Sequence, residues 1–215
     1  MRTISISSDV FAQLPNLQIV FFVVKNLKNN QKMQESQHLF NDLQELTKLT
    51  YHQKSSKNKM LLSPLKIAQQ EYGKQMRHYH SSLERLLQEV LAKKKQRTDT
   101  LTNLVHYLML RYSVPLGVDD IELIQGNLTF AMDGSHLYYY DRKVTLGTNF
   151  DYWKNSNTKV TMNSTSALIH FPFLPHTTPE QARELTQELQ SLVKSFCGGS
   201  IKTFTLNSKK RKITF

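Results

Sequence analysis

The sequence predicts an α+β protein, because helical and strand patterns occupy different parts of the 215-residue chain. Leucines recur at intervals of three or four over 34–49 and 81–95, which is the spacing of amphipathic helices. After Gly117 the pattern changes to short apolar runs bounded by turn residues, which is typical of strands. The apolar run 17–24 predicts one buried strand ahead of these helices.

The first helices begin at residues suited to helix starts. Ser81 or Ser82 is placed to cap the helix predicted over 81–95. The segment 101–112 is more apolar, which predicts a central helix. Pro64 is suited to the first turn of another helix, over 64–72.

The last helix has clear boundaries. Thr178 is in position to cap it, Pro179 is its first residue, and Gly198 follows its final turn. The run after it, 200–206, predicts a closing strand. Other strands are predicted over 121–130, 137–140, 143–146, 159–162 and 167–173, with a hairpin turn at Asp133-Gly134.

The chain is basic, with a formal net charge of +11 and an isoelectric point of about 9.7. Residues 1–97 carry 16 Lys and Arg against 7 Asp and Glu, whereas residues 98–215 carry 12 against 10. Basic runs lie at 93–97 and 209–212. Such a surface attracts phosphate backbones, and it also serves solubility alone, so composition leaves both interpretations open.

Composition also argues against several classes of protein. The longest apolar patch, 19–24, is much shorter than the roughly 18 residues of a membrane helix. Residues 1–11 lack the pattern of a signal peptide. The single cysteine, Cys197, excludes an internal disulfide and is typical of a reducing compartment. We therefore expect a cytoplasmic protein with no membrane partner.

Common catalytic and cofactor motifs do not occur. The histidines are densest at His78, His80 and His106 but lack metal-ligand spacing, so we expect no metal site. Nucleotide-binding glycine motifs and the serine-hydrolase elbow are missing, and no cofactor is predicted. Cys197 lies at the end of a predicted helix, which favours a buried apolar role over a nucleophile.

A first candidate site lies in the stretch 107–128. An apolar helix enters a turn at Pro115 and Gly117, and the carboxylates of Asp119 and Asp120 follow. These carboxylates are candidates for acid–base chemistry or ligand positioning. The alternative is that Asp120 caps a helix while Asp119 faces solvent.

A second candidate site is the polar segment 155–161 beside Trp153. Its amides, hydroxyls and Lys159 can bind a carbonyl, a ribose or a terminal adenosine, and the alternative is a polar turn entering a strand. The run 138–140 consists of tyrosines that could stack on bases. On a strand, alternation favours Tyr139 on one face and its neighbours on the other.

These segments together resemble a known family. The stretch 107–126 is similar to the central editing domain of the bacterial phenylalanyl-tRNA synthetase β subunit, the tRNA-binding B-three/B-four domain. The matching residues there are Tyr107, Leu108, Met109, Leu110, Pro115, Leu116, Asp120 and Gly126. Free-standing relatives are matched further at Ser82, Glu84, Leu86, Leu87, Val114, Gly117, Trp153, Thr158, Val160, Thr161, Thr165 and 196–199. The resemblance covers about residues 75–200.

The resemblance implies a three-layer α+β domain with a β-sandwich of unusual topology flanked by helices. It implies a single domain over 1–215, with a basic helical insertion at about 30–75. The implied activity is hydrolysis of the ester that joins a wrong amino acid to the tRNA 3′ end. The partner would be the acceptor end of aminoacylated tRNA, with no DNA expected. Because no synthetase catalytic core is present, the protein would act in trans.

Several residues depart from the family pattern at its pocket positions, namely Val105-His106, Gly117 and Lys159, so tyrosine specificity is not carried over. As catalytic candidates we take His106, Asp120 and Thr161. His106 or Asp120 would orient a water, and Thr161 or the backbone N–H groups near Gly117 would hold the carbonyl. The substrate-binding candidates are Asn103, Gly117, Asp119, Gly126, Trp153, Asn157 and Lys159. A non-catalytic tRNA- or RNA-binding module and a small-molecule binder for an amino acid or nucleoside remain the alternatives.

Overall fold

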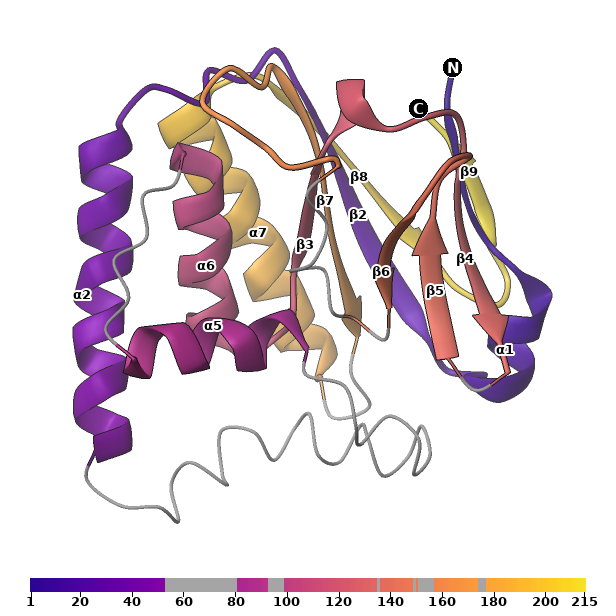
Figure 1. Ribbon diagram of the computed structural model, residues 1–215, viewed down its shortest axis with the longest axis horizontal. Helices are drawn as coiled ribbons and strands as arrows, with labels where there is room; N and C mark the ends of the chain where they lie inside the picture. The colour runs from indigo at the N-terminus through magenta and orange to yellow at the C-terminus, as the bar shows by residue number, and fades with distance from the viewer. Residues whose placement is uncertain (53–80, 93–98, 135, 149, 151–156, 174–176) are drawn as a thin grey trace.

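The computed structural model describes residues 1–52, 81–92, 99–134, 136–148, 150, 157–173 and 177–215. It confirms the α+β class: helices and two sheets, one mixed and one antiparallel, are arranged in layers (Figure 1). A helical layer covers one face of a four-stranded sheet, and a five-stranded sheet lies against its other face. None of the helices in the described ranges is long and apolar enough to cross a membrane.

The four-stranded sheet has the order β3-β7-β2-β8 and is antiparallel throughout. Its strands are β2 (Gln18–Lys25), β3 (Gly117–Asp120), β7 (Ser166–Phe173) and β8 (Ser200–Leu206). Strand β2 pairs along its whole length with β7, from Gln18 opposite Phe173 to Lys25 opposite Ser166. The buried strand predicted over 17–24 is therefore confirmed.

The five-stranded sheet has the order β6-β5-β4-β1-β9. Its strands are β1 (Thr3–Ile6), β4 (Leu128–Asp133), β5 (His136–Tyr140), β6 (Thr145–Thr148) and β9 (Lys212–Thr214). Strands β1 and β4 run parallel, and the other pairs are antiparallel. The predicted hairpin joins β4 to β5, and Gly134 has the positive φ of 58° that its turn requires.

Within the described residues, the outer layer consists of the helices α2 (Met33–His52), α5 (Ser82–Leu91), α6 (Thr100–Tyr112) and α7 (Pro179–Cys197). The short helix α1 (Ser8–Gln13) lies beside the five-stranded sheet. The predicted caps are present: Ser81 and Thr178 each take part in a capping box. The helix predicted over 64–72 falls outside the described residues.

Strand β2 supplies side chains to two separate cores, because successive residues point to opposite faces. Val20, Phe22 and Val24 pack with the helical layer. Phe21 and its alternate neighbours pack between the two sheets. The helix-side core also includes Phe40, Leu86, Leu104, Leu108, Phe171 and Leu189, and the inter-sheet core includes Ile4, Leu128, Phe130, Tyr139 and Leu168.

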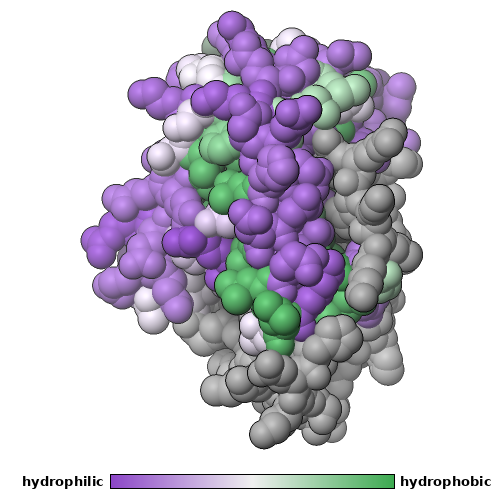
Figure 2. Space-filling model, turned by 90° about the vertical axis from the view of Figure 1, so that its left-hand side faces the viewer, coloured by the Kyte–Doolittle hydropathy of each residue, from purple (hydrophilic) through white to green (hydrophobic). Residues whose placement is uncertain are grey.

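Helix α2 belongs to the helical layer through its first turns. Phe40 is fully buried, and Ser36 is buried as well. Further along, Leu46 and Leu49 are 58% and 64% exposed. Figure 2 shows this side of the molecule, where hydrophilic residues predominate and hydrophobic ones gather near the middle. The remaining part of the proposed basic insertion, from residue 53 to about 75, lies outside the described residues.

The strand predicted over 121–130 is wrong in its first half. Strand β3 ends at Asp120, a 3-10 turn spans Ile121–Leu123, and the chain bends at Gly126, where φ is 81°, before β4 begins. The Asp120 carboxylate accepts a hydrogen bond from the Glu122 N–H at 2.9 Å. This local bond ends the pairing of β3 with β7, because the Glu122 N–H is bonded to a side chain and not to a neighbouring strand.

The strand predicted over 159–162 is also wrong. The Thr161 N–H donates to Ser164 Oγ at 2.9 Å, and the Ser164 N–H donates to the Thr161 carbonyl at 3.0 Å. These local bonds form a turn in place of a ladder. The strand predicted over 143–146 occurs slightly later, as Thr145–Thr148, where its pairing with β5 contains a bulge.

Candidate functional site

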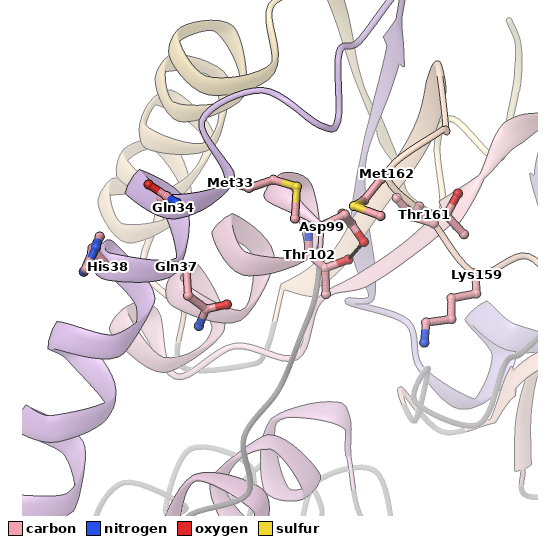
Figure 3. A pocket seen from close by; sticks show the side chains of 10 residues that line it. Met33, Gln34, Gln37, His38, Asp99, Thr102, Lys159, Thr161 and Met162 are labelled. Atoms are coloured by element: carbon pink, nitrogen blue, oxygen red, sulfur yellow. Dashed lines mark hydrogen bonds between the residues drawn. The ribbon is translucent and has the colours of Figure 1, made fainter.

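A hollow of about 740 Å³ opens between α2, the start of α6 and the segment that precedes β7 (Figure 3). We call it the α2–α6 pocket. Helix α2 contributes Met33, Gln34, Gln37 and His38, the start of α6 contributes Asp99 and Thr102, and the facing wall is formed by residues 159–162. Figure 3 shows Asp99 and Thr102 between the α2 wall and the wall that carries Lys159. The volume lies within the range of small-molecule sites.

Asp99 is the N-cap of α6. Its carboxylate accepts hydrogen bonds from the Thr102 N–H at 2.9 Å and from the Thr102 hydroxyl at 2.8 Å. The residue is only 5% exposed. Because these bonds occupy both carboxylate oxygens, Asp99 serves the helix start and is poorly placed to act as a general base.

Asn29 joins the two walls of the pocket. Its side-chain amide donates to Asp99 Oδ1 at 2.8 Å and to the Thr161 carbonyl at 2.8 Å. Its side-chain oxygen accepts from the Leu101 N–H at 2.7 Å. Asn29 is 1% exposed. Sequence reasoning missed this residue, because an asparagine in a polar loop gives no signal of its partners, which lie far along the chain.

The two aspartates of β3 hold the segment that forms the far wall. The Thr158 hydroxyl donates to Asp119 Oδ1 at 2.5 Å, and the Asp120 N–H donates to the Thr158 carbonyl at 2.7 Å. The Ser164 hydroxyl donates to Asp120 Oδ2 at 2.5 Å. Asp119 and Asp120 are therefore placed behind Lys159 and Thr161, where they position the wall and do not line the pocket.

Asp119 lies deep between the two sheets. It is 4% exposed, so the alternative that placed it in solvent is wrong. The Tyr139 hydroxyl donates to its Oδ2 at 3.1 Å, and His170 Nε2 lies 3.4 Å from the same oxygen. His170 is fully buried. These partners offset the cost of removing a carboxylate from water. Tyr139 faces this core, as its place on an alternating strand indicated.

His106 lies on α6 one helical turn after Thr102, and it is not among the residues that line the pocket. It is 7% exposed, and its ring centroid is 5.4 Å from that of Phe40. Burial lowers the pKa of His106 from 6.5 to about 3, so its imidazole is neutral at physiological pH. Asn103, another candidate, is fully buried and donates to the Ser36 hydroxyl at 3.0 Å.

The other sequence candidates are dispersed. Gly117 begins β3, opposite His170, and Gly126 lies in the turn before β4, where an added Cβ would be 3.5 Å from Arg142 Cβ. Asn157 is exposed at the start of the segment that forms the far wall. Trp153 lies outside the described residues. Of the residues selected from sequence, the structure places Lys159 and Thr161 in the pocket lining.

The lining combines polar groups with apolar surface. Lys159 offers a cation, Thr102 and Thr161 offer hydroxyls, and Gln34 and Gln37 offer amides. Met33, Val160 and Met162 supply apolar contact. Such a lining suits a ligand with several hydrogen-bond acceptors and one flat or apolar part. The described lining contains one hydroxyl–carboxylate hydrogen bond, from Thr102 to Asp99. The same carboxylate also accepts the Thr102 N–H and the Asn29 amide, so this pair serves the start of α6.

No protein-family model matches the sequence, and no curated protein is similar enough to count as a match. The assignment of a function therefore rests on the residues and on the geometry of the pocket.

Proposed function

We propose that the protein is a free-standing aminoacyl-tRNA deacylase, which hydrolyses the ester of a mischarged tRNA in trans at the α2–α6 pocket. One observation carries this proposal. The helix start at Asp99–Thr102 and the Lys159–Thr161 run, both within the region that resembles the editing domain, line one pocket. The net charge of +11 supports an RNA substrate.

The pocket suits the end of a charged tRNA. A volume of about 740 Å³ is of the order needed for a nucleoside with an attached amino acid. Met33 and Met162 offer polarizable surface to a base or to an apolar side chain. Lys159 is placed to attract a phosphate or the oxyanion that develops on the ester carbonyl.

Hydrolysis of an aminoacyl ester requires few catalytic groups from the protein. Water attacks the ester carbonyl, the bond from the carbonyl carbon to the ribose oxygen breaks, and that oxygen takes a proton. The neighbouring ribose hydroxyl belongs to the substrate and can help to orient the water. In this arrangement Thr161 positions the carbonyl, and Lys159 stabilises the negative charge. His106 is buried one helical turn after Thr102, and Asp120 lies behind the wall, and neither is among the residues that line the pocket.

The decisive experiment is a panel of mischarged tRNAs incubated with the purified protein. At least one ester should be hydrolysed faster than in buffer. Lys159→Ala should lower kcat/KM for that ester by about tenfold or more, as expected when a group that stabilises developing charge is removed. The matched control is Lys202→Ala, which removes an exposed lysine from β8. Inactivity across the panel, or equal losses in both variants, would contradict the proposal.

A second candidate function is a tRNA-binding module without catalysis. It is favoured by the engagement of the Asp99 carboxylate in helix capping and by the burial of His106. Binding of uncharged and mischarged tRNA with no turnover of any ester would support this function over the first. The same panel therefore separates the two candidates.

A further inference from the structure

The turn between β8 and β9, together with the first residue of β9, carries the densest run of cations in the described part of the chain, namely Lys209, Lys210, Arg211 and Lys212. All of them are exposed. We propose that this basic turn binds the phosphate backbone of duplex RNA. The choice of RNA rests on the proposed function, whereas the binding itself does not require the α2–α6 pocket to be catalytic.

The backbone of the basic turn is fixed by Asn207. Its side-chain oxygen accepts hydrogen bonds from the N–H groups of Lys209 at 3.0 Å and Lys210 at 2.9 Å. The Asn207 N–H donates to the Lys210 carbonyl at 2.9 Å. Because these peptide groups are satisfied within the turn, the cationic side chains are the groups left to meet a partner. A preformed turn also lowers the entropy cost of binding.

The end of the turn is anchored to the five-stranded sheet. The Ile6 N–H donates to the Arg211 carbonyl at 2.8 Å, and Lys212 pairs with Ser5 across β1 and β9. The next residue, Ile213, is buried in the inter-sheet core. Strands β8 and β9 are outer strands of different sheets. The turn that joins them lies on the side of the molecule away from the helical layer (Figure 1). It is thus a surface separate from the pocket.

The charge of the turn is not neutralised within the described residues. In that part of the chain, no carboxylate lies within 4.0 Å of the basic groups of residues 209–212. Even a fully extended chain advances only about 3.3 Å per residue, so the four cations fall within about 10 Å. Each strand of a DNA duplex carries one phosphate charge per about 3.4 Å of the helix axis, which is similar to the spacing of these cations.

The composition of the turn favours phosphate contacts over base contacts. The non-basic residues within it are Asn207 and Ser208, so it has no aromatic ring on which an unpaired base could stack. Phosphate contacts are independent of base sequence. A duplex, with its bases already stacked, is therefore the form of RNA that this turn suits best.

The test compares two quadruple variants that lower the net charge equally. In the test variant, Lys209, Lys210, Arg211 and Lys212 are replaced by Gln. In the control variant, four exposed cations on other elements are replaced by Gln, namely Lys28, Arg142, Arg183 and Lys194. Binding of each protein to a short fluorescent RNA duplex, with no amino acid attached, is measured between about 50 and 200 mM salt.

We expect the test variant to bind at least tenfold more weakly than the control variant. Its salt dependence should be shallower, by about one unit in the slope of log K against log salt for each phosphate that the protein no longer neutralises. Equal losses of affinity in the two variants would overturn the proposal, as would tighter binding to a DNA duplex, an acidic peptide or anionic vesicles. Since the duplex carries no ester, failure of the deacylase assay leaves this result unaffected.

Discussion

The burial of His106 predicts a specific loss of stability in acid. Its imidazole has a pKa of about 3 in the folded protein and about 6.5 in the unfolded chain. The unfolded state therefore binds a proton that the folded state excludes between these two values. This contribution to stability is complete above pH 6.5 and declines as the pH falls toward 3.

The size of the effect follows from linkage, at about 1.4 kcal/mol for each pH unit below the unfolded pKa. Because His106 stays neutral in the folded state, the free energy of unfolding should be about 2 kcal/mol lower at pH 5 than at pH 7.5. His106→Gln and His106→Phe both remove the titrating group, and Phe keeps a ring beside Phe40. Each variant should lose about 2 kcal/mol less than the wild type over this pH range.

The assay is urea unfolding of wild type and variants at pH 7.5 and pH 5, followed by circular dichroism. The quantity compared between proteins is the change in the free energy of unfolding from pH 7.5 to pH 5. Any destabilisation that the substitution causes at both pH values therefore cancels. His38→Gln, at an exposed position on α2, controls for the loss of a histidine as such. If the His106 variants lose as much stability in acid as the wild type, the assignment of a buried neutral imidazole is refuted.

Other substitutions test the pocket walls and the backbone. Asn29→Ala should lower the free energy of unfolding by about 2–4 kcal/mol, because it leaves buried partners unsatisfied, as chemical denaturation would show. Gly199→Ala should destabilise far more than Gly134→Ala in thermal unfolding. Both glycines have positive φ, but a Cβ at 199 would overlap the Lys25 carbonyl oxygen, whereas a Cβ at 134 meets nothing within 4 Å. Burial raises the pKa of Cys197 to about 12, so the native protein should resist iodoacetamide at pH 8 and react once unfolded, as mass spectrometry can follow.

The helices could be predicted from sequence because their signals are local. The capping boxes of α5 and α7 lie within four residues, and the apolar stripe of each helix repeats along its own length. The strand β2 was equally clear, since both of its faces are buried and its residues from Ile19 to Val24 are all apolar.

The pocket could be predicted only in part. Lys159 and Thr161 were selected because both lie in a polar segment; Thr161 matches a family pattern, whereas Lys159 departs from it at a pocket position. Asn29 acts through hydrogen bonds to Asp99 and Thr161, which are distant along the chain, and no local pattern records them. The burial of Asp119 likewise depends on Tyr139, which only the packing of one sheet on the other brings within reach.

The position of β2 has a consequence for the order in which the chain folds. Its sheet partners, Ser166–Phe173 and Ser200–Leu206, follow it by more than 140 residues. Contacts of such long range form slowly, because the intervening chain must first be brought together. During synthesis from the N-terminus, the most apolar strand is made early and acquires both neighbours only after Leu206 has emerged. Until then, Gln18–Lys25 is an apolar segment with at least one unpaired edge, and it needs protection from aggregation.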